Sequence, residues 1–481
     1  MLSSLSIVIL LPLIEILTAN LAKKNRYLHK LILLKIAVIE ILIAINLDIS
    51  KNIYVINFGF FSLKFMCDIY SYFFTILVIA MWILTIIYAD SYSRIAINRK
   101  RLSSFFKNLS LSIFAVIGGA YSADLWTLLI FYILLIIFTS ILIIQNPSKE
   151  SIRAKNLYLK THLLTSIFML LPAIIILQSY THNVNFDGGN ISKIMDNKLV
   201  ASSLLFLFIV GISKNCIFPF TRWITKSTVA ANPVSALLHS VAGVKSGSIA
   251  LIKIIVYIYG LDNIRELTSS FFTGGWVFYL CGITAVGAAY QALKSQDIKK
   301  RFAFSTISQL SYITSSLMIA TPLSIIAAIL HIISHSICKA LLFYIAGIFS
   351  VVYKTRSTIA ISRIAPFVKL WIFCIAILGS SIIGLPFLPG SYGKDYMIIS
   401  EYQTHHYSSL IFLIIGSFIN ILYIYPIIKA GFFTKKIDQI ETAIIPFGMK
   451  FAIGLGMIIT ISISFFMKEI IAFFNIYINL N

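Results

Sequence analysis

Long apolar segments, separated by short polar connections, run through almost the whole sequence. A membrane-spanning helix needs about 20 mostly apolar residues, so these segments predict about fourteen transmembrane helices and an all-α polytopic membrane protein. The most polar connection, residues 181–198, carries no catalytic motif. The predicted spans are residues 2–21, 30–48, 69–89, 109–121, 125–145, 162–180, 199–217, 233–259, 272–293, 303–320, 323–350, 366–386, 408–430 and 446–471.

The composition agrees with a lipid environment. Hydrophobic residues make up 59% of the 481 residues and charged residues 12%, and the mean hydropathy is +0.93. A soluble domain cannot bury that much apolar surface within itself. We therefore expect a single membrane domain without a soluble domain.

Basic residues give a formal net charge of +22 and concentrate in the connections after every second span. The first such group is Lys23, Lys24 and Arg26, and the last is Lys435 and Lys436. Because Lys and Arg are retained on the cytoplasmic side, this alternation predicts that the odd-numbered loops are cytoplasmic and that both termini lie outside. The charge therefore indicates topology in a bacterial inner membrane or its organelle equivalent, and no nucleic-acid partner.

The cysteines are too widely spaced to form a CxxC pair, so the sequence predicts no iron–sulfur cluster and no zinc site. We interpret them as packing residues in the membrane. They are Cys67, Cys216, Cys281, Cys338 and Cys374.

Two predicted spans are interrupted by proline. The seventh is interrupted at its end by Ile217–Phe218–Pro219, and the twelfth by the segment Gly384–Gly390. Proline removes a backbone donor, and in lipid the freed carbonyl groups need partners or water, so broken helices tend to line polar paths. The breaks lie an odd number of spans apart, which predicts two inverted five-helix repeats. Two unrelated proline kinks are the alternative.

Several lysines lie within the predicted spans, where each costs about 2.5 kcal/mol or more unless it is paired or hydrated. Lys35 and Lys253 lie close enough to a span end to extend to the membrane surface. Lys245 has no such escape, because it lies about 18 Å into a core of about 30 Å. Lys214 and Lys394 flank the two helix breaks. We therefore interpret Lys214, Lys245 and Lys394 as part of an ion path.

The eleventh span contains the sequence HIISHSICK, which places His331, His335 and Lys339 on one face of a helix. A His–x3–His pair can bind a metal, but no third ligand of carboxylate or thiolate type is evident nearby. Histidines titrate near neutrality, so with Lys339 the pair predicts a proton relay. His239, which precedes Lys245 by less than two turns, is expected to join this relay.

Few carboxylates lie within or beside the spans. They are Glu15, Glu40 and, at a helix mouth, Asp124. Glu40 is the deepest of the three, and we interpret it as a hydrogen-bonded structural acid. The sequence leaves the roles of Glu15 and Glu40 open.

The segments around these residues resemble the antiporter-like membrane subunits of complex I (the L, M and N types of NADH-quinone oxidoreductase) and of Mrp-type multisubunit Na+/H+ antiporters. The resemblance rests on four segments in the family order: KNCIFPFTRWITKSTVAANPVSALLHSVAGVKSG (214–247), QDIKKRFAFSTISQLSY (296–312), HIISHSICKALLFYIAG (331–347) and GLPFLPGSYGKDYMI (384–398). The resemblance extends over about residues 110–430 and implies fourteen helices with two inverted repeats. It also implies no redox cofactor in this chain.

Carried over by position, the resemblance makes Lys214 the lysine of broken helix 7, Lys245 that of helix 8 and Lys394 that of broken helix 12. It also matches the eleventh-helix relay to His331, His335 and Lys339.

Two positions depart from the family pattern. A family motif, ADLxxLxxFxE, carries a glutamate on the fifth helix that pairs with the lysine of helix 7. Here Ile133 occupies the position of that glutamate, and Thr221 stands where many members have histidine. The resemblance therefore implies that Lys214 lacks its carboxylate partner.

The sequence thus predicts helices 1–3 at residues 1–108, an antiporter-like core at 109–430 and a C-terminal helix 14 at 431–481. We expect an H+- or Na+-translocating subunit of a complex-I-like or Mrp-type assembly, using Lys214, His239, Lys245, His331, His335, Lys339 and Lys394. The alternative is a paralogue that no longer pumps and acts as a scaffold. An enzyme acting on quinone or lipid has no supporting motif, although the assembly itself can be an NADH dehydrogenase.

Overall fold

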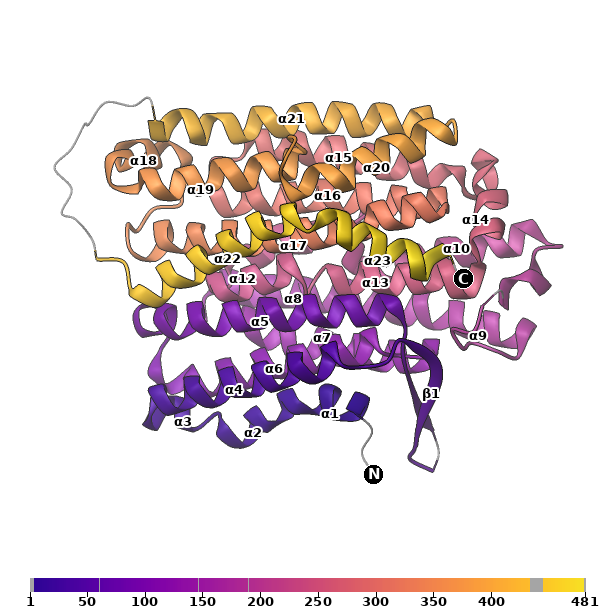
Figure 1. Cartoon of the computed structure of the whole chain (residues 1–481), viewed down its shortest axis with the longest axis horizontal. Coiled ribbons are helices and arrows are strands. Elements are labelled where there is room, and N and C mark those ends of the chain that lie inside the picture. The colour runs from indigo at the N-terminus through magenta and orange to yellow at the C-terminus, as the bar shows by residue number, and fades with distance from the viewer. Residues whose placement is uncertain (1–3, 60, 146, 189, 433–443, 480–481) are drawn as a thin grey trace.

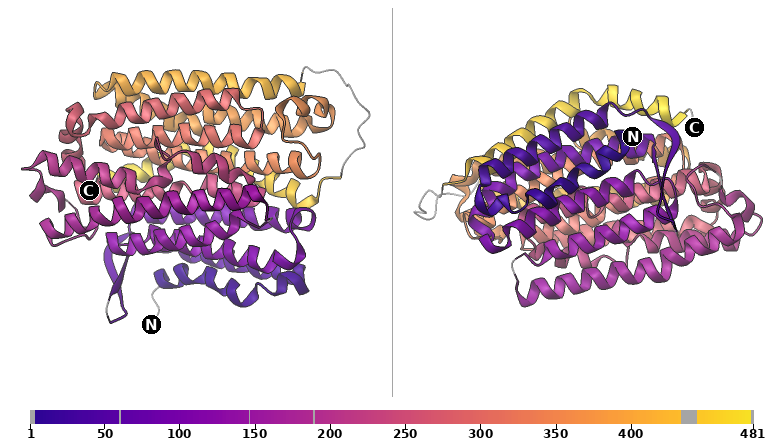
Figure 2. Two further views of the ribbon diagram at one scale, coloured as in Figure 1. Left: turned by 180° about the vertical axis from the view of Figure 1, so that it is seen from behind. Right: turned by 90° about the horizontal axis from the view of Figure 1, so that it is seen from below.

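Helices built from the apolar segments lie side by side in one bundle, with the N-terminal helices along one flank and the helices of residues 276–432 along the other (Figure 1). The computed structural model describes residues 4–59, 61–145, 147–188, 190–432 and 444–479. Two further views show that the helices keep this common direction through the depth of the bundle (Figure 2). The last two helices cross this arrangement obliquely, because α22 and α23 run diagonally over α17 (Figure 1).

The first part of the bundle is formed by nine α-helices joined by short 3-10 and π segments. Their bounds are α1 Ser4–Leu10, α2 Glu15–Thr18, α3 Leu21–Lys24, α4 Arg26–Ile45, α5 Ile69–Ala96, α6 Leu102–Ala120, α7 Leu125–Ile143, α8 Lys149–Thr165 and α9 Leu171–Thr181. The connecting segments include η1 Leu11–Ile14, η2 Arg99–Arg101, the π segment η3 Ser166–Leu170 and η4 Asn190–Ile194.

The remaining helices form the centre and the opposite flank. Their bounds are α10 Lys198–Gly211, α11 Arg222–Lys226, α12 Asn232–Ser240, α13 Lys245–Lys253, α14 Leu261–Thr268, α15 Trp276–Lys294, α16 Ile298–Ile319, α17 Pro322–Val351, α18 Thr358–Arg363, α19 Ala365–Ile383, α20 Pro389–Gln403, α21 Tyr407–Phe432, α22 Phe447–Phe465 and α23 Met467–Asn479. The segments η5 Ser213–Asn215, η6 Ser227–Val229, η7 Ile254–Tyr259 and η8 Phe271–Gly275 join them.

Within the described residues, nine helices are long and apolar enough to cross a membrane. Three shorter apolar helices, at 4–18, 198–211 and 368–383, accompany them. Helix α4 is also apolar over most of its length but carries Lys30, Lys35 and Glu40, and the interrupted helices have short halves. The chain is therefore a mostly helical, multi-pass membrane protein, and the number fourteen and the inverted repeats stay predictions.

A β-hairpin stands apart from the helices and was missed by the sequence analysis, which expected helices alone. Strands β1 (Ser50–Asn57) and β2 (Ser62–Cys67) pair in antiparallel fashion and project from the bundle (Figure 1). The hairpin occupies the connection between two predicted spans. The length of apolar segments predicts spanning helices only, so it could not reveal strands in this connection. Backbone hydrogen bonds from Ala123 to Lys64 and from Met66 to Tyr121 attach β2 to the start of α7.

The predicted helix breaks are confirmed. Helix α10 ends at Gly211, and Cys216 adopts a left-handed conformation before α11 begins. Helix α19 ends at Ile383, followed by Gly384 and Phe387 with positive φ. A third break, at residues 241–244, separates α12 from α13 and was not predicted, because no proline marks it.

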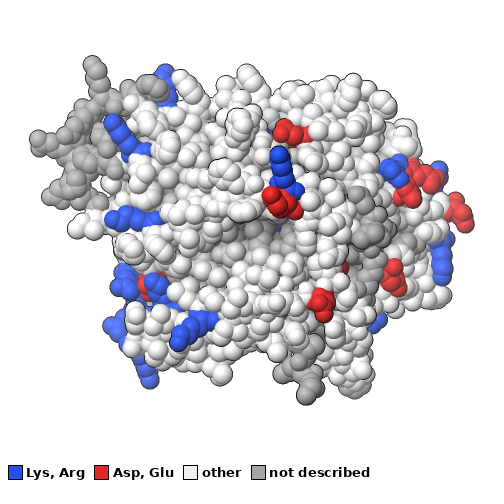
Figure 3. Space-filling model, viewed as in Figure 1, with Lys and Arg blue, Asp and Glu red and all other residues white. Residues whose placement is uncertain are grey.

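Lys and Arg side chains gather at one end of the bundle on the face shown in Figure 3, whereas acidic side chains lie mainly toward the opposite end. At this basic end, defined by α3 and η2, Arg99 donates to the backbone oxygen of Lys23. The hairpin end, defined by β1, β2 and residues 120–124, lies opposite. Lys435 and Lys436 lie outside the described residues. This distribution fits the predicted alternation, and the sidedness stays a prediction.

The second break depends on the close approach of α20 to α19. A Cβ added at Gly390 would overlap the carbonyl oxygen of Ser381, whereas one added at Gly287 would meet nothing within 4 Å. We expect Gly390→Ala to destabilise the protein by about 1–3 kcal/mol, as in other overpacked sites, and Gly287→Ala to have no such effect. Thermal unfolding in detergent measures both variants; equal midpoints would contradict the close approach of these helices.

Candidate functional site

Lys214 lies in η5, inside the first helix break, and its side chain is fully buried. Its ammonium lies over the ring of Tyr132 on α7, 4.2 Å from the ring centroid. Its backbone N–H donates to the Tyr132 hydroxyl at 3.3 Å. The ammonium has no hydrogen-bond partner among the described residues. An aromatic face stabilises a desolvated cation by about 2 kcal/mol. The neutral ring of Tyr132 therefore stabilises the charge of Lys214.

The sequence analysis missed a histidine in this cluster. His162, in the last turn of α8, is fully buried, and its Nδ1 lies 2.7 Å from the hydroxyl of Ser213, the residue before Lys214. Its ring contacts Tyr158 and Trp223, both at 4.5 Å between centroids. The signal was available in the sequence as a histidine inside an apolar span.

Lys245 is the first residue of α13, directly after the unpredicted break, and its buried ammonium has no hydrogen-bond partner in the described ranges. His239, near the end of α12, stacks on Phe343 of α17 at 4.3 Å between centroids. His239 therefore packs against α17, and Lys245 lies within electrostatic range of His335 and Lys339 on the same helix.

On α17 the two histidines of the predicted stripe lie together. The rings of His331 and His335 stack with centroids 5.8 Å apart, and both are buried. None of their ring nitrogens has a hydrogen-bond partner within the part of the chain that the structure describes. The described residues also contain no group of three or more His, Cys, Asp or Glu side chains able to hold a metal. The pair is thus two neighbouring buried imidazoles whose ring nitrogens make no hydrogen bond to the described residues.

Lys339 and Lys394, unlike Lys214 and Lys245, donate hydrogen bonds from their ammonium groups to described residues. Lys339 donates to Ser305 at 2.7 Å and to the backbone oxygen of Phe302 at 3.2 Å. Lys394, beside the second break, donates to Ser417 at 2.8 Å and to the carbonyl oxygen that Ile383 exposes at the end of α19, at 2.9 Å. The break therefore supplies the acceptor that an ammonium needs inside the membrane.

The elements that carry these lysines and histidines contact one another in succession, η5 with α13, α13 and α12 with α17, and α17 with α20; we call this set of buried lysines and histidines the file. The charges interact along it. His335 lies within electrostatic range of Lys245, Lys339, His331 and His239, and His331 is within range of Lys394. Movement of a proton at one member therefore changes the energy of charge at the next.

The two departures from the family pattern leave no charge at their positions. Ile133 is half-buried and packs on the core one residue after Tyr132, and Thr221 precedes α11. The side chain that faces Lys214 from α7 is therefore an aromatic ring and not a carboxylate.

Lys253 does not extend to the membrane surface, which corrects the prediction from sequence. Its side chain is fully buried at the hairpin end and pairs with Asp68, 3.1 Å away. It also donates to the backbone oxygens of Ala120 and Ser122, at 2.6 and 2.7 Å. Position near a span end could not reveal a carboxylate contributed by a distant residue. Lys35, by contrast, is exposed on α4.

The acidic side chains differ from one another. Glu15 is buried with His29, whose Nε2 lies 2.8 Å from its carboxylate. Glu40 was expected to be a hydrogen-bonded acid, but its carboxylate is fully buried without a hydrogen-bond partner among the described residues, so that interpretation is wrong. Asp124 caps α7 by accepting from the backbone of Thr127 at 2.7 Å.

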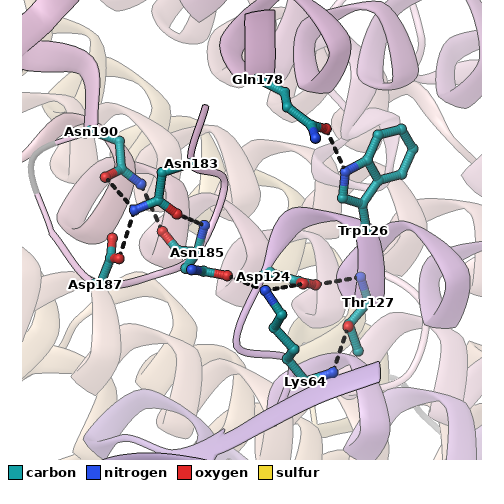
Figure 4. A network of polar contacts seen from close by, with 9 residues as sticks. All are labelled: Lys64, Asp124, Trp126, Thr127, Gln178, Asn183, Asn185, Asp187 and Asn190. Carbon is teal, nitrogen blue, oxygen red and sulfur yellow. Dashed lines mark hydrogen bonds and ion pairs between the residues drawn. The ribbon is translucent and has the colours of Figure 1, made fainter. Parts of the chain in front are cut away.

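A polar network surrounds Asp124 at the hairpin end (Figure 4). Lys64 lies 3.7 Å from the Asp124 carboxylate and donates to Asn185 at 2.9 Å. Asn183, Asp187 and Asn190 join the same network and order the connection after α9. A pocket of about 360 Å³ opens beside it, lined by residues that include Lys64, Asp124, Trp126, Gln178 and His182. This network ties β2, the start of α7 and the 183–190 connection together.

The fold and the buried file define a multi-pass membrane protein with ionisable side chains held across its interior. The family described as "NADH:quinone oxidoreductase/Mrp antiporter, TM" matches residues 122–420. The chain belongs to this family, which confirms the resemblance found in the sequence.

Curated relatives extend this result. The chain is 26% identical over 479 residues to the putative antiporter subunit mnhD2 of Staphylococcus aureus, covering 96% of this chain and 93% of that protein. It is 27% identical over 341 residues to a probable K(+)/H(+) antiporter subunit of Rhizobium meliloti, and 31% over 257 residues to NADH-ubiquinone oxidoreductase chain 5 of Candida parapsilosis. These matches cover 70% and 52% of this chain. The chain spans only 33% and 44% of the latter two proteins.

Two solved structures share the fold. A chain of the membrane-bound sulfane sulfur reductase, an archaeal respiratory membrane complex, superposes with a TM-score of 0.83 at 19% identity, over 99% of this chain and 96% of that one. A chain of the Mrp complex from Dietzia sp. DQ12-45-1b gives 0.78 at 18% identity, over 96% of this chain and 50% of that one. At these identities the likeness concerns the fold alone.

The Lys253–Asp68 pair gives a stability prediction. Replacing one partner of a buried ion pair leaves an uncompensated charge, so we expect Lys253→Met to destabilise the protein by about 3–5 kcal/mol. The double variant Asp68→Asn with Lys253→Met should recover most of that loss, because the amide still caps α5 and no charge remains. Thermal unfolding in detergent measures both, with Lys64→Met as the control for a partly exposed pair. Equal destabilisation of the single and double variants would contradict the pairing.

Proposed function

We propose that this chain is an ion-translocating subunit, moving protons or exchanging Na+ for protons, within a complex-I-like or Mrp-type assembly of several membrane subunits. The observation that carries the proposal is the set of buried lysines and histidines on neighbouring elements. Such groups are expensive in a membrane interior and mark ion paths. Family membership supports the same function.

In the proposed path, protons pass along Lys245, His239, His331, His335 and Lys339 and leave by Lys394, while Lys214 modulates the charge of the file. The stacked histidines transfer protons because each ring nitrogen can accept or donate. Lys394 is suited to receive the proton at the end of the path, because Ser417 and the carbonyl of Ile383 stabilise its ammonium form.

Partners and sidedness belong to the same proposal. Both solved relatives are chains of multisubunit membrane complexes, and mnhD2 is itself named as a subunit. We therefore propose that this chain works with other membrane subunits. The basic loops lie in the cytoplasm and both termini outside, in agreement with the gathering of Lys and Arg at one end of the bundle (Figure 3).

A second candidate is a non-pumping scaffold subunit. The observation in its favour is Ile133, which removes the acid expected opposite Lys214 and leaves the ring of Tyr132 there. A subunit with a silent first half could still seal an assembly through its apolar surfaces.

Ion exchange in everted vesicles, with the partner subunits co-expressed, separates the two candidates. We expect Lys245→Ala and Lys394→Ala each to lower Na+- or pH-dependent proton exchange to the empty-vesicle level, because each removes a proton-carrying member of the file. Lys35→Ala, which changes an exposed span lysine, should leave exchange unchanged. If Lys245→Ala and Lys394→Ala both exchange ions as fast as the wild-type protein, the relay is eliminated. If the wild-type protein itself exchanges no faster than empty vesicles, the scaffold is favoured.

The position of the missing acid can also be tested. We expect Ile133→Glu to raise exchange several-fold, because a carboxylate on α7 would stabilise the charged form of Lys214. Ile133→Gln is the matched control, since it has a similar size and no charge. A folded Ile133→Glu variant with unchanged exchange would show that the flank formed by α7 no longer takes part.

A further inference from the structure

The surroundings of Lys214 contain an ionisable side chain that neither the family pattern nor the proposed path uses. We propose that His162 replaces the missing carboxylate as the proton-sharing partner of Lys214, which makes the α7–α8 flank an active end of the file. This inference rests on the proposed function and adds a residue to it.

The first argument is the placement of His162. Its side chain is fully buried in α8, about 20 Å along the helix from Lys149. Nδ1 contacts Ser213 at 2.7 Å, and Nε2 has no hydrogen-bond partner among the described residues. Buried histidines in stable cores normally satisfy both ring nitrogens. One nitrogen is therefore held in position while the other remains available.

His162 is connected to Lys214 through the neighbouring residue Ser213. The Ser213 hydroxyl also shares a hydrogen bond with Thr165 at 2.8 Å, and the Lys214 N–H donates to the hydroxyl of Tyr132, whose ring centroid lies 4.2 Å from the Lys214 ammonium. The charge of Lys214 acts directly on His162. The Ser213 hydroxyl thus joins His162 and Thr165 of α8 to η5, the segment that carries Lys214.

The third argument is local backbone structure. Helix α8 changes into the π segment η3 directly after Thr165, and the hydroxyl of Ser166 donates to the backbone oxygen of His162 at 2.7 Å. Such π segments are frequent at functional sites because they reorient side chains that a regular helix would direct elsewhere. Here the change occurs within one turn of the histidine.

The chemistry follows from burial and charge. Two neighbouring buried cations repel each other strongly, so His162 and Lys214 together hold one proton. When the Lys214 N–H bond breaks, the proton forms an N–H bond on His162, and the cluster keeps one positive charge. The charge nevertheless moves from η5, on the α10 side of the break, toward α8, which changes the electric field on the other lysines and histidines. The other titratable groups facing this site are Tyr132, Tyr158 and Cys216.

The test compares His162→Asn with wild type in everted vesicles containing the full assembly. Asparagine can keep the bond to Ser213 at the position of Nδ1 but cannot carry a proton. We expect exchange to fall tenfold or more and its pH profile to lose one ionisation. The matched control is His29→Gln, which changes a buried histidine outside the file and keeps a donor for Glu15 at the position of Nε2. It should exchange like wild type.

Two combinations distinguish proton sharing from a purely structural role. If the two groups share one proton, His162→Asn with Lys214→Met should lose no more exchange than the worse single variant. Ile133→Glu added to His162→Asn should restore at least half of the lost exchange, because the new carboxylate again provides Lys214 with a charged partner. Wild-type exchange in His162→Asn, multiplicative losses in the double variant, or a loss without rescue and without a changed pH profile would each overturn the inference.

The same vesicles separate this inference from the proposed function. Absence of exchange in wild type, or its persistence in Lys245→Ala, would refute the function itself. Exchange that depends on Lys245 but is indifferent to His162 would refute only the role of His162. If His162→Asn gives no folded protein, His162→Gln replaces it in the same comparisons, with the same outcomes required.

Discussion

The free energy of placing charge inside a membrane governs this structure. A lysine in the bilayer interior costs about 2.5 kcal/mol or more unless other groups compensate it, and this protein buries several. Each of those with a visible partner takes it from an irregular part of the backbone or from a distant helix. Lys394 uses a carbonyl exposed by the second break, and Lys253 uses carbonyls of residues 120 and 122 together with Asp68. The second break thus supplies an acceptor for one of these charges, and the end of α6 and the start of α5 supply those for another.

The same constraint explains the asymmetry between the two flanks of the file. Near α20, Lys394 has two oxygen acceptors, whereas near α7 Lys214 has an aromatic face and a neighbouring histidine. An aromatic face stabilises a cation without changing its own charge, so it cannot respond to proton movement. A histidine can. In the proposed path, the histidine beside Lys214 therefore keeps this flank responsive to proton movement although position 133 carries no acid.

The fold was accessible from sequence to the extent that it depends on the membrane. Apolar segment length, proline at position 219 and the Gly384–Gly390 segment sufficed to locate the helices and two of the breaks. The third break carries no proline, and the hairpin is too short and too polar to register among the apolar segments. Both became visible only when the packing of α12 against α17 and of β2 against residues 121–123 was present.

For the site, the sequence by itself determined which residues can carry charge and which of them share a helix face, because a helical period fixes the relation of His331 to His335 and Lys339. The tertiary structure alone decided the partners. Lys253 was expected at the membrane surface and instead meets Asp68; Glu40 was expected to be bonded and is not; His162 was overlooked and lies beside Ser213. The physical reason is that a partner is chosen by distance in space between residues far apart in the chain, and apolar periodicity contains no record of that distance.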